Sequence, residues 1–205
     1  MIIERLEVGA CAANCYIVSD EAGGQGMIID PGDEADRILD LVKKLELEIK
    51  HIVLTHGHID HVGALREAKE ATGASVAVHT GDMATLNDKT LSIVLGIPYK
   101  APPAIDRLLE DGDIVSVGGL GFTVIHTPGH TPGGICLLGE GVVFTGDTLF
   151  QYGIGRGDLP GGSYEKLMDS IRNRLMVLGD DVVIYPGHGP ETTIGTERRG
   201  NPFLI

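Results

Sequence analysis

Three imidazoles and one carboxylate fall within six residues of one short segment: His56, His58, Asp60 and His61. Imidazole and carboxylate are the ligands that borderline divalent metals such as zinc prefer. In an extended segment, His56 and His58 project to the same side. Asp60 and His61 come where the chain is expected to enter a helix, so they point elsewhere. One short loop can therefore serve two neighbouring metal ions.

Four side chains leave two coordination shells incomplete, and further candidate ligands occur later in the sequence. Each of them follows an apolar run that is typical of a β-strand, and each lies on a glycine-rich turn: His130, Asp147 and His188. His56 has the same local context. Because strand ends in layered α/β folds converge on one edge, where loops build sites, we expect these side chains to meet in space.

The rest of the sequence indicates the elements that position these residues. Short apolar runs separated by glycines predict β-strands over 2–8, 15–19, 27–29, 51–54, 75–78, 114–117, 122–125, 135–138, 142–144 and 182–185. Helical spacing of apolar residues predicts helices over 36–45, about 60–71, 81–95 and 163–178. This order favours two sheets packed together with helices outside. No linker or shift in composition marks a boundary, so a single domain over residues 1–205 is expected.

Composition and charge narrow the class of protein. The chain has 205 residues and a net charge of 16 − 29 = −13, which argues against nucleic acid as a partner, because phosphate binding depends on Lys and Arg. No membrane partner is expected, since no stretch of 18 uncharged apolar residues exists. The N-terminus lacks the basic start of a signal peptide, and three cysteines are too few for a disulfide framework. A cytoplasmic protein with free thiols is expected.

The H-x-H-x-D-H loop, followed in order by the later His, Asp and His, resembles the metallo-β-lactamase superfamily. The resemblance covers nearly the whole chain and implies an α/β fold, a four-layer αβ/βα sandwich with a metal site along one edge. It also implies two divalent metal ions per chain, with zinc expected and iron or manganese as alternatives. By this resemblance metal 1 binds His56, His58 and His130, metal 2 binds Asp60, His61 and His188, and Asp147 bridges both together with a water or hydroxide. Asp30 matches the first motif of the family and is expected to orient the metal loop.

Within that superfamily the chain resembles the glyoxalase II group, also called hydroxyacylglutathione hydrolases. The segments 146–150, 153–156 and 191–204 carry this similarity. It implies hydrolysis of thioesters such as S-D-lactoylglutathione, with Arg156 matching a basic position that contacts the glutathione carboxylate. The chain departs from the group in three ways: Pro190 and Asp158 stand where the group has tyrosines that contact substrate, and the helical C-terminal domain of the full-length enzymes is expected to be absent.

The mechanism that we expect is attack on the thioester carbonyl by a hydroxide held between two metal ions, with Asp60 and Asp147 as catalytic carboxylates. A small-molecule thioester, with glutathione as one candidate for its thiol carrier, is the expected partner, and the sequence predicts no oligomeric state. Two alternatives stay open. The persulfide dioxygenase group also resembles this chain and uses one Fe(II), bound at the equivalents of His56, His130 and Asp147. The other alternative is a metal-binding module without turnover.

The segment 81–103 is either a lid over the site or ordinary packing.

Overall fold

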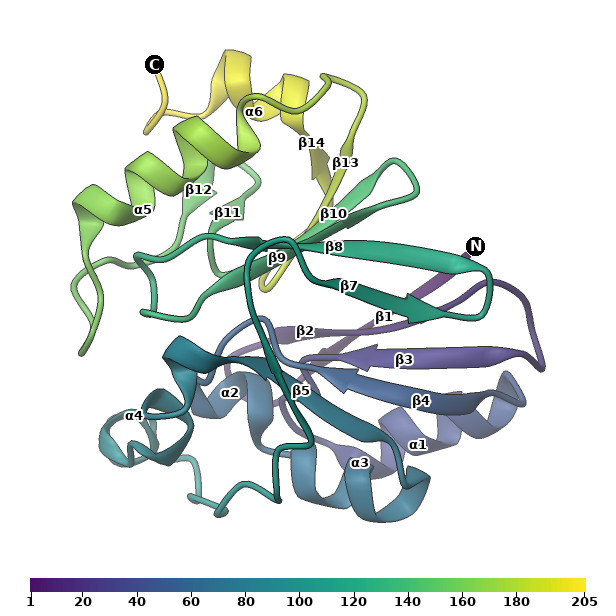
Figure 1. Ribbon diagram of the computed structural model, residues 1–205. Coiled ribbons are helices and arrows are strands. Elements are labelled where there is room, and N and C mark those ends of the chain that lie inside the picture. The colour runs from purple at the N-terminus through teal and green to yellow at the C-terminus, as the bar shows by residue number, and fades with distance from the viewer.

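Two six-stranded β-sheets lie face to face in the computed structural model, which describes residues 1–205 (Figure 1). The first sheet runs in the order β1 (Ile2–Val8), β2 (Ala13–Ser19), β3 (Gln25–Ile29), β4 (Glu48–Val53), β5 (Ser75–His79) and β6 (Arg107–Leu109). The second sheet runs in the order β14 (Thr192–Thr193), β13 (Val183–Pro186), β10 (Val142–Gly146), β9 (Ile135–Gly139), β8 (Leu120–His126) and β7 (Ile114–Val117). A separate ribbon pairs β11 (Leu149–Phe150) with β12 (Gly153–Ile154).

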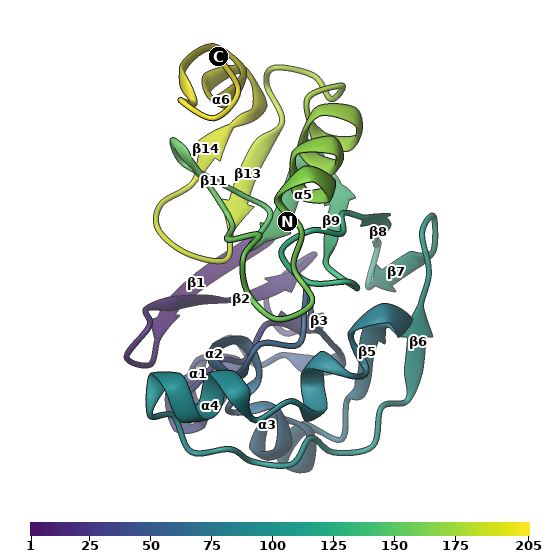
Figure 2. The same ribbon diagram turned by 90° about the vertical axis from the view of Figure 1, so that its left-hand side faces the viewer.

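Helices cover the outer face of each sheet, and two perpendicular views show the same layers (Figures 1 and 2). The first sheet is covered by α1 (Ala35–Lys44) and α3 (Leu65–Thr72). The second sheet is covered by α5 (Tyr164–Ser170), by a π-helical turn that extends it (Ile171–Leu175), and by α6 (Ile194–Gly200). The predicted four-layer αβ/βα sandwich is therefore confirmed.

Strand β2 shows how the sequence pattern produces these layers. All seven of its residues are buried, as expected for a strand with an apolar layer on each face. Because successive side chains of a strand point to opposite faces, Cys15 and Ile17 pack toward the helices of the first sheet. Tyr16 and Val18 pack instead against the second sheet.

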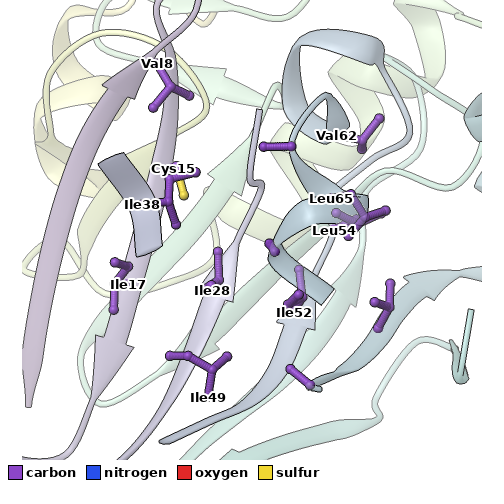
Figure 3. Close-up of a cluster of buried hydrophobic side chains, with 14 of the residues drawn as sticks. Val8, Cys15, Ile17, Ile28, Ile38, Ile49, Ile52, Leu54, Val62 and Leu65 are labelled. Atoms are coloured by element: carbon purple, nitrogen blue, oxygen red, sulfur yellow. The ribbon is translucent and has the colours of Figure 1, made fainter. Parts of the chain in front are cut away.

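Three apolar layers hold the four structural layers together. The largest contains 18 buried residues between the first sheet and its helices, part of which is drawn in Figure 3. A second layer of 15 residues fills the space between the two sheets and includes Phe122 and Phe144. The third joins the second sheet to α5 and α6 through nine residues, among them Leu167 and Ile194. Burial of apolar surface on this scale is the main favourable term in folding.

The ends of four strands meet at one edge of the sandwich. In the second sheet β10 is parallel to β13, and it is also parallel to β8, because both are antiparallel to β9. Their carboxyl ends therefore lie at the same edge. The end of β4 joins them there, because the Ile135 backbone N–H donates to the Thr55 carbonyl across the two sheets at 2.9 Å.

The helix predicted over about 60–71 is broken in two, which corrects the sequence-based expectation. The chain forms α2 (Ile59–Val62), then breaks at Gly63 and Ala64 before α3 begins. The Ala64 backbone N–H donates to the Pro31 carbonyl at 3.0 Å, and a side chain at Gly63 would collide with the Gly32 carbonyl. Close approach of this neighbouring loop, which depends on the tertiary structure, interrupts the local helical pattern.

The helix predicted over 81–95 also differs from the structure. This stretch forms two single turns, η1 (Thr80–Asp82) and η2 (Thr85–Asn87), before the short helix α4 (Thr90–Leu95). The Asp88 side chain accepts from the Thr90 backbone N–H at 2.8 Å and so starts α4 anew. The short strands β6, β11, β12 and β14 and the helix α6 were not predicted.

None of the helices combines the length and the apolar character needed to cross a lipid bilayer. The expectation of free thiols is confirmed: Cys15 and Cys136 are buried, Cys11 is half-buried, and none forms a disulfide.

Candidate metal centre

The structure brings together all seven side chains that the sequence singled out as metal ligands. The potential ligand atoms of six of them form two groups, in each of which every ligand atom lies within 4.8 Å of the others. The first group comprises His56, His58 and His130, and the second comprises Asp60, His61 and His188. The closest nitrogens of each group are 2.9 Å apart (His58 Nδ1 and His130 Nε2) and 3.2 Å apart (His61 Nε2 and His188 Nε2).

Asp147 lies between the two groups. One carboxylate oxygen is 3.4 Å from His61 Nε2 of the second group. The other oxygen is 3.5 Å from His130 Nε2 of the first group and 3.6 Å from His188 Nε2 of the second. This position allows one carboxylate to serve both groups at once, as the resemblance to the family implies.

Hydrogen bonds fix the ring nitrogens of His130 and His61 that face away from the centre. The Nδ1 of His130 lies 2.8 Å from the Arg156 carbonyl, which can only accept, so this nitrogen carries the proton. The Nδ1 of His61 donates to a carboxylate oxygen of Asp30 at 3.1 Å. In the neutral rings the Nε2 atoms are then left with free lone pairs aimed into the centre. This is the arrangement that metal-binding histidines commonly have.

Asp30, which the sequence analysis expects to orient the loop of His56 and His58, hydrogen-bonds to Thr55 at the start of that loop. Its carboxylate accepts from the Thr55 backbone N–H at 2.7 Å and from the Thr55 hydroxyl at 2.5 Å. Since the single hydroxyl proton of Thr55 is used in this bond, His56 Nδ1 must be the donor in its 3.1 Å contact with Thr55 Oγ1. Asp30 lies close enough to His56 and His61 to be a metal ligand. Because both of its oxygens already accept hydrogen bonds from protein donors, an orienting role is favoured over metal ligation.

Two buried atoms in the centre have no hydrogen-bond partner: His56 Nε2 and Asp147 Oδ1. A buried polar atom without a partner costs about 1–3 kcal/mol, and it is rare in folded proteins. Both atoms are electron-pair donors of the kind that divalent cations bind. The residues present therefore fit a metal ion in each group.

Burial and charge act in opposite directions on the histidines of the centre. Burial lowers the pKa of His56 well below its usual value and lowers the pKa of His58 to about 3. Burial acts the same way on His61, but the carboxylates of Asp147, Asp60 and Asp30 outweigh it and raise the pKa of His61 to about 10. In the metal-free protein at neutral pH, His56 and His58 are therefore neutral, and a proton on His61 balances part of the negative charge.

We expect metal binding at pH 7 to release at least one proton per chain, because a cation must displace the proton on His61. The affinity for the metal ion should rise as the pH increases from 6 toward 9. Each displaced proton contributes up to about a tenfold increase per pH unit. Titration calorimetry with zinc in two buffers of different ionisation enthalpy measures the release. Identical binding enthalpies in both buffers would contradict the charge assigned to His61.

Strand β2 positions the loop that carries His188. The Asn14 side chain donates to the carbonyls of Pro186 and Gly189 at 2.9 and 2.8 Å, and its backbone N–H donates to the Gly187 carbonyl at 2.7 Å. A side chain at Gly187 would overlap the Asp147 carboxylate. Glycine is therefore required at this position for the two ligand-bearing loops to approach each other.

Asp82 is a further residue of the centre, and the sequence analysis missed it. It is fully buried, and its carboxylate accepts from the backbone N–H groups of Gly57 at 2.9 Å and Gly133 at 2.6 Å. It also accepts from the Thr131 hydroxyl at 2.8 Å. Asp82 thereby joins the loops of His58 and His130 to the segment that follows β5. The only signal in the sequence is that this aspartate follows shortly after a predicted strand, as the predicted ligands do.

Arg156 lies at the mouth of the centre rather than among the ligands. It lines a cavity of about 420 Å³ above them, together with His58, Asp147 and His188. Its exposed guanidinium makes two hydrogen bonds to Asp158, at 2.9 and 2.8 Å. The segment 81–103, which the sequence left open as a lid or as packing, contributes part of the opposite wall through α4.

Comparison with known proteins places this arrangement in context. The family model described as "Metallo-beta-lactamase superfamily" matches residues 8–188. A relative from Haemophilus influenzae, named "Hydroxyacylglutathione hydrolase GloC", is 43% identical over 216 residues, covering 100% of this chain and 98% of its own.

Two solved structures also match closely. The BLEG-1 B3 metallo-β-lactamase has a TM-score of 0.94 and 35% identity and covers 100% of both chains. TTHA1623, solved in a di-iron-bound form, has a TM-score of 0.89 and 38% identity and covers 98% of this chain and 100% of its own. One relative is named a hydroxyacylglutathione hydrolase and another a metallo-β-lactamase, so the relatives do not agree on a substrate.

Proposed function

Since the chain belongs to the metallo-β-lactamase superfamily and is thereby a metallo-hydrolase, we propose that it cleaves thioesters with the help of two divalent cations. The first cation is held by His56, His58 and His130. The second is held by Asp60, His61 and His188, and the carboxylate of Asp147 is shared between the two. Zinc is the expected metal, and the di-iron-bound relative makes iron the first alternative.

The position of Asp147 is the observation that carries the proposal of two cations. Its two oxygens lie 3.4–3.6 Å from nitrogens of both groups, and Oδ1 is buried without a donor. Cations held by the two groups would both attract this carboxylate, since bound cations are the largest local charges in a site. A site for one cation would leave the other group of donors without a partner.

When bound, two such cations supply Lewis acidity, which activates water near neutral pH and polarises a carbonyl oxygen. The protein supplies the rest of the chemistry. Asp60 and Asp147 provide the fixed negative charge that retains the cations, and either carboxylate can take up the proton that the attacking water loses. Because a thiolate is a good leaving group, hydrolysis of a thioester needs no strong general acid, and the centre contains no lysine or tyrosine that would act as one.

Two observations favour thioesters over other carbonyl substrates. The relative named as a hydroxyacylglutathione hydrolase aligns over the whole of this chain, and Arg156 lies beside the cavity at a position suited to a carboxylate of the thiol carrier. The Arg156–Asp158 pair is exposed on both sides. Since exposed ion pairs contribute little to stability, a carboxylate of the substrate can take the place of Asp158 at small cost.

The test is an anaerobic assay of thiol release from S-D-lactoylglutathione by protein loaded with zinc. We expect turnover without oxygen, with kcat in the ordinary range of about 1–10³ s⁻¹. Consumption of oxygen with glutathione persulfide by protein holding one Fe(II), and no thiol release from any thioester, would instead establish the dioxygenase alternative. If the protein bound metal but showed neither activity, the result would support the alternative of a metal-binding module without turnover.

A further inference from the structure

A second cavity adjoins the one above the metal centre. It has a volume of about 200 Å³, and His58 belongs to the lining of both cavities. Three residues line both cavities: His58, Leu91 and Pro160. In both views of the molecule the loop between β12 and α5, which contains Pro160, descends toward α4, which contains Leu91 (Figures 1 and 2). A substrate whose reacting carbonyl lies at the centre can therefore extend into both cavities.

The two cavities differ in their chemistry. The larger one contains Arg156, the single cationic side chain in either lining apart from the histidines. The smaller one has walls of proline, glycine and aliphatic residues, contributed by Gly57, Ile59, Ala84, Leu91, Pro132, Pro160 and Gly161. Its other lining residues are His58, Thr85 and Asp88. A neutral, apolar group gains from burial against such walls, whereas an anionic group would face Asp88 without a cation.

We propose that the smaller cavity, here called the acyl pocket, receives the acyl group of the thioester, and that the thiol carrier lies in the larger cavity beside Arg156. This inference rests on the proposed function and adds a substrate class to it. At about 30 Å³ for each non-hydrogen atom, a volume of about 200 Å³ holds about six or seven atoms beyond the carbonyl. The acyl pocket thus fits neutral acids of medium length, and acetyl or lactoyl groups fill only part of it.

The experiment compares thioesters of one small neutral carrier, N-acetylcysteamine, that differ only in the acyl group: acetyl, butanoyl, hexanoyl, dodecanoyl and succinyl. We expect kcat/KM to rise about two- to fourfold with each methylene up to hexanoyl and to rise no further at dodecanoyl. The succinyl thioester should be at least tenfold slower than butanoyl, because its carboxylate meets Asp88. Dissociation constants of the matching non-hydrolysable 2-oxoalkyl thioethers should follow the same order.

An Ala84→Phe variant tests the place of the acyl group. Ala84 is exposed and lines the acyl pocket, so a phenyl ring there fills the pocket without entering the core. We expect the ratio of kcat/KM for hexanoyl to that for acetyl to fall at least tenfold. The matched control is Ala71→Phe, which adds the same exposed ring on α3, outside both linings, and should leave the ratio unchanged.

Three outcomes would overturn the inference while leaving the proposed function intact. The first is a rate that does not depend on acyl length in the wild type. The second is an equal loss for every acyl group in Ala84→Phe, which would place the carrier in the acyl pocket. The third is an equal change of the ratio in Ala71→Phe. Failure of the proposed function looks different, because no thioester in the series would then release its thiol.

Discussion

Replacing Asp147 with alanine is expected to remove bound metal and thioester turnover together. The variant loses a carboxylate that lies 3.4–3.6 Å from histidine nitrogens of both groups, so neither cation keeps its full set of ligands. If Lewis-acid assistance contributes about 4 kcal/mol to the transition state, kcat/KM should fall by about 10³-fold. Elemental analysis after dialysis and a thioester assay on the same sample measure both effects.

Asp181→Ala is the matched control, because Asp181 is an exposed aspartate outside the centre that makes no side-chain hydrogen bond or ion pair. It should keep both the metal content and the rate of the wild type. The account of Asp147 would be wrong if Asp147→Ala kept the metal content and turnover of the wild type. A loss of turnover with full metal content would restrict Asp147 to a role in the reaction itself.

Replacing Asp82 with alanine is expected to have the second largest effect, although Asp82 contacts no predicted ligand directly. The substitution leaves the buried N–H groups of Gly57 and Gly133 and the Thr131 hydroxyl without their acceptor. At about 1–3 kcal/mol for each unsatisfied group, partly relieved by entering water, the free energy of unfolding should fall by about 3 kcal/mol. Urea unfolding of the metal-free protein measures this loss.

Metal affinity separates a positioning role of Asp82 from a purely structural one. Because Asp82 joins the loops of His58 and His130, zinc affinity should fall by about 10–100-fold, as for other groups that orient ligands. Asp82→Asn keeps one acceptor oxygen and should lie between the alanine variant and the wild type in both measurements. A variant that is destabilised but binds zinc with the affinity of the wild type would contradict the positioning role.

Much of the centre could be predicted from the sequence because its residues are chemically conspicuous. Histidines spaced as His56, His58 and His61 are rare by chance, and His130, Asp147 and His188 share the same place behind an apolar run. The fold could be predicted from the sequence for a related reason. Strands buried on both faces, such as β2, appear as short apolar runs between glycines, and a helix such as α1 places its apolar residues on one face.

The features that sequence reasoning missed depend on contacts between distant segments. An aspartate near a strand end has the same appearance whether it is a solvated turn residue or, like Asp82, the shared acceptor of two loops. The break between α2 and α3 comes from the close approach of Gly32 to Gly63, which no local pattern contains. Strands of two residues, such as β11 and β14, are too short to show any periodicity.

The central claim is that seven separated side chains form one site for two cations, and anomalous X-ray diffraction from crystals of the zinc-loaded protein tests it most directly. We expect two anomalous peaks per chain. One should lie within bonding distance of His56, His58 and His130, the other within bonding distance of Asp60, His61 and His188, with Asp147 touching both. A single peak, or peaks elsewhere in the molecule, would contradict a two-cation centre.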